Sequence, residues 1–336
     1  MIDTDLLPSW VHWQARPFPD SNLLLLPGPH PALIDTGFVG HAEQTRDWAR
    51  AHAGPIELVV NTHWHSDHVG GNAALQATGT AIAASAPDAD AIRRRDPGCC
   101  LAEYLDQPVA PYTVDLALED EQSIDLGEVT WQIIRTPGHT PGHLSLWQPD
   151  EQLLVVGDAL SDYDVGWVAT ALDGPEAAAT ALASLERLDA LHPRVLLPAH
   201  GPIPADPASA LAQAHRRAKR LVDDPDGSVW YAARRVFAFA LIIRGGLPVD
   251  TVHDYLLARA WLTDAADLLR RPAGELATEL VDTMRRSGAI TEQDGRIRAA
   301  ADHAPVDPGS LDQPWPREWP ATDVAGPATS NGASRS

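Results

Sequence analysis

One polar run that directly follows a strand-like segment limits what this chain can fold into more than any other feature. Residues 56–60 (IELVV) predict a buried strand, and the sequence His63-Trp64-His65-Ser66-Asp67-His68 comes just after it. Because alternate side chains of an extended segment share a face, the first two histidines can reach one point. The aspartate and the last histidine follow where the chain turns, and they can face a second point nearby. Imidazole and carboxylate groups are suitable ligands for divalent metals, so the run predicts two neighbouring metal sites.

Three more candidate ligands each follow a predicted strand. His139 lies in the turn TPGHTPGH, Asp158 ends the strand LLVVGD, and His200 comes after the strand that ends in LLP. Loops at strand ends on one edge of a sheet are where sites are commonly assembled. Together with the four residues of the polar run, they make seven ligands, enough for two metal ions.

Alternating strands and helices in residues 1–205 indicate a mixed α/β domain. Strands are expected at 21–36 (two of them), 56–60, 80–84, 129–136, 144–148, 153–157 and 195–198. Helices are expected at about 40–53, after 71 and at 175–191, with a loop-rich stretch at 86–120.

The pattern changes after residue 205. Amphipathic segments at about 206–223, 228–244, 248–268 and 273–287 predict helices, and an Asp-Gly turn within AITEQDGRIRA predicts a hairpin. Helices followed by a hairpin resemble a winged-helix module, so residues 206–300 are expected to form a second domain. Residues 301–336 are rich in Pro, Gly and Ser and are expected to be a disordered tail, with Trp315 and Trp319 holding part of it to the body.

The charge distribution restricts the partners. The formal net charge is −21, and residues 1–205 carry 28 acidic and nine basic side chains, hence −19. Such a surface disfavours nucleic acid as a partner of the first domain. No apolar stretch approaches the roughly 20 residues of a membrane-spanning helix, and the first residues do not have the pattern of a signal peptide, so a cytoplasmic protein is expected.

Five separate motifs resemble those of metallo-β-lactamase-fold hydrolases, and most closely the glyoxalase II-like and lactonase-like members. They are LIDTG, THWHSDHVGG, PGHTPGH, VVGDAL and PAHGP, and the resemblance covers about residues 20–204. It implies an αββα sandwich and a site with two divalent metal ions. Zinc is the default metal for such ligands, and iron or manganese would also fit.

The resemblance also implies how the ligands divide between the two metals. One metal would bind His63, His65 and His139, the other would bind Asp67, His68 and His200, and Asp158 would bridge them. Asp35 matches a position from which a carboxylate can orient a ligand histidine, or it is a turn residue at a strand end. His143 is interpreted as structural.

The chemistry expected of this site is hydrolysis of a carboxylic ester, thioester or lactone by a metal-bridging hydroxide. Asp67 would orient the hydroxide and take up its proton. Tyr163 is a candidate for stabilising an oxyanion, and Tyr104, Tyr112 and Trp167 are candidate pocket residues. The site would carry a charge of about +1, which suits a small neutral or monoanionic substrate.

Two other activities of the same fold stay open. A phosphodiesterase or ribonuclease would require a basic path to the metals, which the acidic first domain disfavours. An iron enzyme of the persulfide dioxygenase kind would need only the three histidines of the first metal and one more ligand, and would leave the second set unexplained. The second domain is expected to cover the site or mediate a homodimer rather than bind nucleic acid.

Overall fold

Two β-sheets lie face to face in the computed structural model, which describes residues 6–320. The first sheet has the strand order β1-β2-β3-β4-β5-β6. Its strands are β1 (His12–Gln14), β2 (Leu23–Leu26), β3 (Ala32–Ile34), β4 (Leu58–Val60), β5 (Ala81–Ser85) and β6 (Leu116–Leu118). The second sheet has the order β11-β10-β9-β8-β7. Its strands are β7 (Ser123–Leu126), β8 (Val129–Arg135), β9 (Leu144–Gln148), β10 (Leu153–Gly157) and β11 (Val195–Pro198).

The position of strand β2 explains why its sequence is apolar on both faces. Leu24 and Leu26 point into the core between the two sheets, where they join residues of the second sheet such as Leu146. Leu23 and Leu25 point the other way, into a core shared with helix residues. A strand buried on both faces becomes a continuous apolar run instead of an alternating one.

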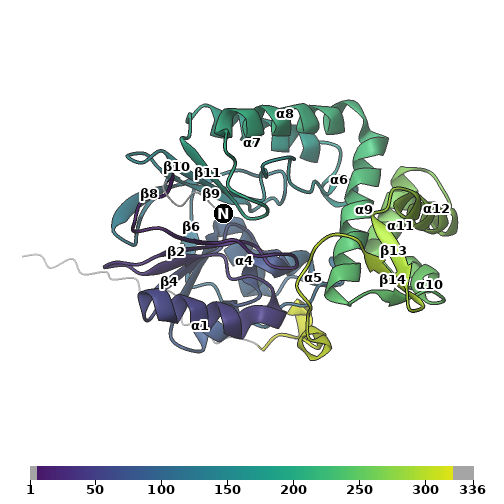
Figure 1. Cartoon of the computed structure of the whole chain (residues 1–336), viewed down its shortest axis with the longest axis horizontal. Helices are drawn as coiled ribbons and strands as arrows, with labels where there is room; N and C mark the ends of the chain where they lie inside the picture. The colour runs from purple at the N-terminus through teal and green to yellow at the C-terminus, as the bar shows by residue number, and fades with distance from the viewer. Residues whose placement is uncertain (1–5, 321–336) are drawn as a thin grey trace, which may run out of the picture.

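Helices cover the outer faces of both sheets (Figure 1). Helices α1 (Ala42–Ala53), α3 (Asn72–Gln76) and α4 (Ala86–Arg94) lie on the first sheet, and α7 (Ala177–Asp189) and α8 (Pro207–Asp223) lie on the second. Two further short helices are α2 (Ser66–Val69) and α6 (Thr170–Asp173). The expected αββα sandwich is confirmed.

A separate group of helices follows α8, to one side of the sandwich (Figure 1). These are α9 (Pro225–Ile243), α10 (Val252–Leu257), α11 (Ala260–Leu268) and α12 (Ala273–Arg286). The expected hairpin is present as β13 (Ile290–Gln293) and β14 (Arg296–Ala299), with β12 (Leu247–Pro248) as a third strand. The prediction of a single helix at 248–268 is wrong, because the helix is interrupted between α10 and α11. The winged-helix assignment stays a prediction.

The loop-rich stretch expected at 86–120 is also wrong. It contains α4, the 3₁₀ turn Cys99–Leu101, α5 (Ala102–Leu105) and β6. The start signals of α4 were present in the sequence: the Ser85 hydroxyl accepts the backbone N–H of Asp88, and a proline occupies the first turn.

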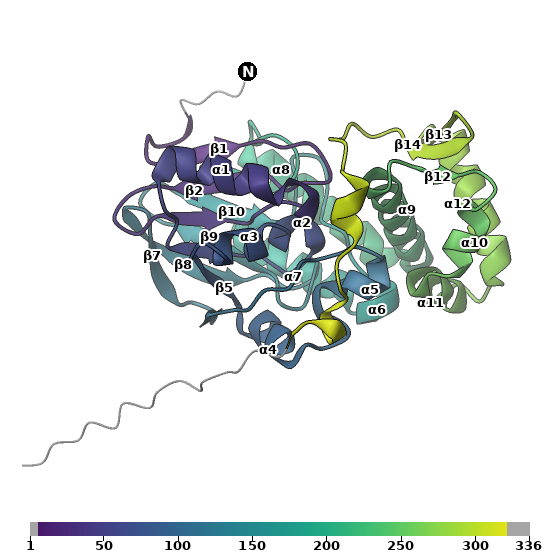
Figure 2. The same ribbon diagram turned by 90° about the horizontal axis from the view of Figure 1, so that it is seen from below.

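Residues 301–320 pack on the sandwich instead of forming a disordered tail. They run back along the first sheet's side of the molecule toward α4 (Figure 2). Ala304 donates its backbone N–H to the Phe18 carbonyl at 2.6 Å, and Trp319 is 3% exposed among core residues of the first sheet. Trp315 packs against the same core, as expected. The rest of the predicted tail, 321–336, lies outside the described residues. Within residues 6–320, no helix is long and apolar enough to cross a membrane.

Candidate metal centre

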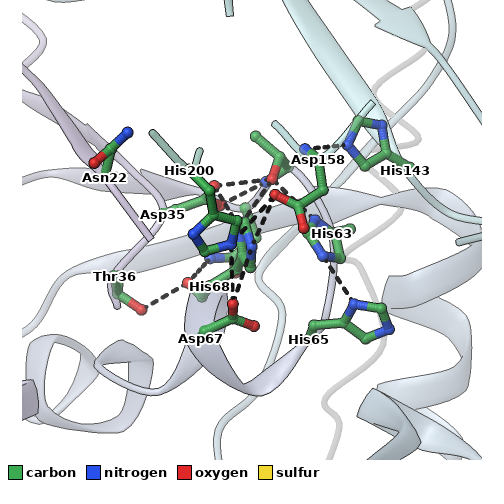
Figure 3. A network of polar contacts seen from close by, with 12 residues as sticks. Asn22, Asp35, Thr36, His63, His65, Asp67, His68, His143, Asp158 and His200 are labelled. Atoms are coloured by element: carbon green, nitrogen blue, oxygen red, sulfur yellow. Dashed lines mark hydrogen bonds and ion pairs between the residues drawn. The ribbon is translucent and has the colours of Figure 1, made fainter. Parts of the chain in front are cut away.

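All seven predicted ligands lie together in neighbouring clusters. Figure 3 labels all of them except His139. The polar run supplies four of them from the end of β4 and from α2. The β8–β9 turn supplies His139, the end of β10 supplies Asp158, and the segment after β11 supplies His200. Five of the seven residues are buried, and the side chains of Asp158 and His200 are 14% and 12% exposed. The sandwich therefore brings together residues up to 137 positions apart, from 63 to 200.

The first cluster consists of three histidines whose nitrogens converge. The His63 Nε2 to His65 Nδ1 distance is 3.1 Å, and His139 Nε2 lies 3.0 Å from the first and 2.9 Å from the second. Nitrogens bound to one tetrahedral metal at about 2.1 Å lie roughly 3.4 Å apart, close to these values. Three nitrogens in this triangle are arranged as ligands of a single ion.

Hydrogen bonds on the far side of two rings fix which nitrogen is free. His139 Nδ1 donates to the Trp167 carbonyl at 2.7 Å, and His68 Nδ1 donates to Asp35 Oδ2 at 2.8 Å. A carbonyl oxygen can only accept, and a carboxylate does so when ionised, so each Nδ1 carries the proton. In both rings Nε2 therefore faces the site, and it is the nitrogen left for a metal ion.

The second cluster consists of Asp67, His68 and His200, with Asp158 between it and the first. His200 Nε2 lies 3.1 Å from Asp67 Oδ2. One oxygen of Asp158 lies 3.5 Å from Nε2 of both His68 and His200, and the other lies 3.4 Å from His139 Nε2. Asp158 thus presents one carboxylate oxygen to each cluster.

The donor set fits two divalent ions. His68 Nε2 and Asp158 Oδ1 are buried atoms without a hydrogen-bond partner in the described structure. A buried polar atom left unpaired is costly, and a metal ion would satisfy both.

The charges agree with this interpretation. Burial keeps the pKa of His63, His65 and His139 below the usual value, so these imidazoles stay neutral and able to donate a lone pair. At the second cluster, burial is outweighed by the carboxylates of Asp35, Asp67 and Asp158, which raise the pKa of His68 to about 10. Without a metal ion His68 therefore holds a second proton among these carboxylates, and a bound ion would take the place of the proton on Nε2. Burial alone would raise the pKa of Asp158, but the surrounding histidines hold it well below its usual range. The carboxylates of the second cluster therefore attract positive charge.

Asp35 and His143 support the ligands from outside. Besides holding His68, Asp35 accepts hydrogen bonds from the backbone N–H and the hydroxyl of Thr62, both at 2.8 Å. Asp35 therefore orients a candidate ligand histidine, the first of the two roles considered for it. His143 Nε2 accepts the backbone N–H of Asp158 at 3.0 Å, so this nitrogen is not free to bind a metal. Its interpretation as a structural residue agrees with this contact.

The candidate ligands open into a cavity of about 320 Å³. Of the four aromatic residues suggested for the pocket, Tyr163 and Trp167 line it. Tyr163 is 51% exposed and lies at the rim. Tyr104 and Tyr112 do not line it: the Tyr104 hydroxyl donates to Asp264, and Tyr112 is buried beside Trp319.

Sequence reasoning missed most of the cavity wall. Helix α9 supplies Tyr231, Arg235, Val236, Ala238, Phe239 and Ile242, and the N-terminal segment supplies Phe18. The Phe18 ring stacks on His200 with centroids 4.7 Å apart. The amphipathic pattern of α9 predicted a buried face, but nothing in the pattern indicated that part of this face borders the site.

Comparisons with known proteins identify the family. The profile of the metallo-beta-lactamase superfamily matches residues 19–200, more than half of the chain. The chain belongs to the metallo-beta-lactamase superfamily. The matched range contains all seven candidate ligands and ends before α8 and α9.

Curated relatives match this chain over part of its length. A hydroxyacylglutathione hydrolase of Methylococcus capsulatus is 35% identical over 133 residues, which is 38% of this chain and 42% of that protein. One from Ectopseudomonas mendocina is 32% identical over 165 residues, 48% of this chain and 52% of that protein. The matches thus span about half or less of these curated relatives.

Two solved structures support the fold over a longer range. A metallo-beta-lactamase family protein of Thermus thermophilus superposes with a TM-score of 0.53 at 22% identity, covering 88% of this chain and 99% of that one. A beta-lactamase domain protein of Burkholderia ambifaria gives 0.53 at 21% identity, covering 88% and 93%. At these identities the likeness concerns the fold alone.

Proposed function

We propose that this chain is a metal-dependent hydrolase that cleaves a carboxylic thioester, ester or lactone with two divalent metal ions. One observation carries the proposal: two ligand clusters, joined by Asp158, open into the same cavity. The partial similarity to hydroxyacylglutathione hydrolases supports a thioester as the first substrate to test. Zinc is the first metal to test, with iron and manganese next.

Each candidate residue has a defined task in this reaction. His63, His65 and His139 would hold one ion, Asp67, His68 and His200 the other, and Asp158 would contact both. When bound, the two ions polarise the substrate carbonyl and lower the pKa of the attacking water toward neutrality. Asp67 lines the cavity, where its carboxylate can orient that water and accept its proton. Tyr163 at the rim is a candidate donor to the developing oxyanion.

The C-terminal helices would complete the substrate site. Because α9 lines the cavity together with the candidate ligands, we propose that residues 206–300 act as its cover. Residues 1–205 would then form the catalytic domain. A homodimer stays a prediction from the sequence.

The test combines metal content with a substrate screen. We expect about two zinc, iron or manganese ions per chain by elemental analysis, and hydrolysis of thioesters, esters or lactones rather than phosphodiesters. Asp67→Ala should abolish hydrolysis, while Asp47→Ala, on the exposed face of α1, should not change it. One iron per chain without hydrolysis would refute the proposal and favour an iron oxygenase, and cleavage of phosphodiesters alone would favour a nuclease.

A further inference from the structure

The cavity beside the candidate metal centre is lined mainly by apolar side chains. On the side of His200, Phe18 packs edge-to-face with Phe239, with ring centroids 6.3 Å apart. On the side of His65, the Trp167 ring lies 5.7 Å from the imidazole, and Leu105 lies on the same cavity lining. These walls can remove an apolar group from water next to the point where the carbonyl must react.

The positively charged side chain in this cavity is already paired with other residues of the protein. Among its lining residues, all of which the structure describes, Arg235 alone carries a permanent positive charge. Its guanidinium contacts the Tyr231 hydroxyl and lies 3.6 Å from Asp164 Oδ2. A glutathionyl group carries two carboxylates and an ammonium group, and this wall offers them one guanidinium that already has partners.

We propose that this cavity binds the apolar acyl chain of the substrate, and that the polar thiol or alcohol part stays at the open rim. This inference rests on the proposed hydrolase function. Biological thiol carriers bear charged or amide groups, so the acyl part is the one that an apolar wall can select. Tyr163, half exposed at the rim, lies where the polar part would leave the cavity.

Helix α9 determines how long that acyl chain can be. Ala238 lies on the cavity lining, beside Phe239 in sequence, and it is only partly buried. A larger side chain at this position would project into the cavity and occupy the volume that the acyl chain needs. We therefore infer that Ala238 is a specificity-determining residue.

The first experiment measures binding without catalysis. Acetate, butyrate, hexanoate and octanoate are titrated calorimetrically into the zinc-loaded full chain. Each buried methylene should raise the association constant by about threefold to fourfold until the cavity is full. In Ala238→Leu this rise should stop at a shorter chain, whereas the matched variant Ala212→Leu, exposed on α8, should follow the wild type. Ala238→Val makes the same test if the leucine variant does not fold.

The second experiment separates this inference from the proposed function. Hydrolysis rates are compared for acyl thioesters of increasing chain length on one simple thiol, and for a hydroxyacyl thioester of glutathione. Higher kcat/KM for longer acyl chains, lost in Ala238→Leu, supports the inference. A preference for the glutathione thioester, or acid binding that does not change with chain length, overturns it even when hydrolysis occurs. Chain-length-dependent binding without hydrolysis of any substrate supports the acyl cavity and refutes the hydrolase proposal.

Discussion

Replacing Asp35 by Asn tests whether an outer carboxylate controls the second metal site. Asp35 is 2% exposed, and its Oδ2 accepts the His68 Nδ1 proton at 2.8 Å. The backbone of Asp35 has a φ of 58°, a left-handed conformation that Asn tolerates better than most residues. The substitution keeps the shape of the side chain and removes its charge, so it changes the hydrogen bond without an expected change of fold.

The effect follows from proton positions. The backbone N–H of Thr62 needs an acceptor and is bonded to Oδ1, so the Asn oxygen takes that place. The amide nitrogen then stands where Oδ2 was and directs N–H toward His68 Nδ1. That ring nitrogen must then accept, and the proton moves to Nε2, the atom proposed to bind metal. Loss of such an outer partner typically costs about 10–100-fold in metal affinity, or about 1.4–2.7 kcal/mol.

Zinc titration against a chromophoric chelator measures this effect site by site. We expect Asp35→Asn to weaken the second zinc by about 10–100-fold and to leave the first, at the three histidines, unchanged. Asp47→Asn, on the exposed face of α1, is the matched control and should bind both ions as the wild type does. Two zinc ions at wild-type affinity in Asp35→Asn would refute the reasoning, and so would loss of the first ion alone.

Two further predictions concern stability. Burial raises the pKa of Asp88 to about 7, so between pH 4 and 7 the folded protein keeps a proton that the unfolded chain has lost, and stability falls as pH rises. Asp88→Asn should remove this fall. By urea unfolding, the variant should be more stable than the wild type by a few kcal/mol at pH 8 and equally stable at pH 4. A variant whose stability changes with pH in parallel with the wild type would contradict this prediction. Asp106 Oδ2 lies 2.7 Å from Arg244 and 2.8 Å from Arg259, and both arginines are mostly buried. Asp106→Ala should therefore lower the free energy of unfolding by about 2 kcal/mol in the same assay. A loss below about 0.5 kcal/mol would show that this contact does not hold the C-terminal helices.

The sequence was most informative where the structural signal is local. The strands at 144–148, 153–157 and 195–198 are present with these bounds, because each is an apolar run between turn residues. The polar run after β4 indicated two neighbouring ligand sets, because an extended segment followed by a turn presents its side chains in two directions. Strands with mixed polarity, such as β7, gave no such signal and were not expected.

Contacts between segments far apart in the chain could not be predicted from local sequence patterns. His139, Asp158 and His200 became candidates because each follows a predicted strand. Only the register of the second sheet brings their side chains to one point. Residues 301–320 are rich in turn formers, which favoured disorder. Their order depends on Trp319, whose burial requires a core built by residues much earlier in the chain, Tyr112 among them.

The cavity wall shows why the family does not determine the substrate. The superfamily match ends at residue 200, so the candidate ligands lie inside it, while Arg235, Ala238 and Phe239 of α9 lie outside it. Under the proposed function, ligand geometry and substrate selection would reside on separate parts of the chain, which contacts such as that of Asp106 with Arg244 hold together. If the acyl cavity is as proposed, a change in α9 would alter which acyl group is bound without moving a candidate ligand. Resemblance in the first 200 residues therefore supports the reaction type, and α9 must be tested directly to establish the substrate.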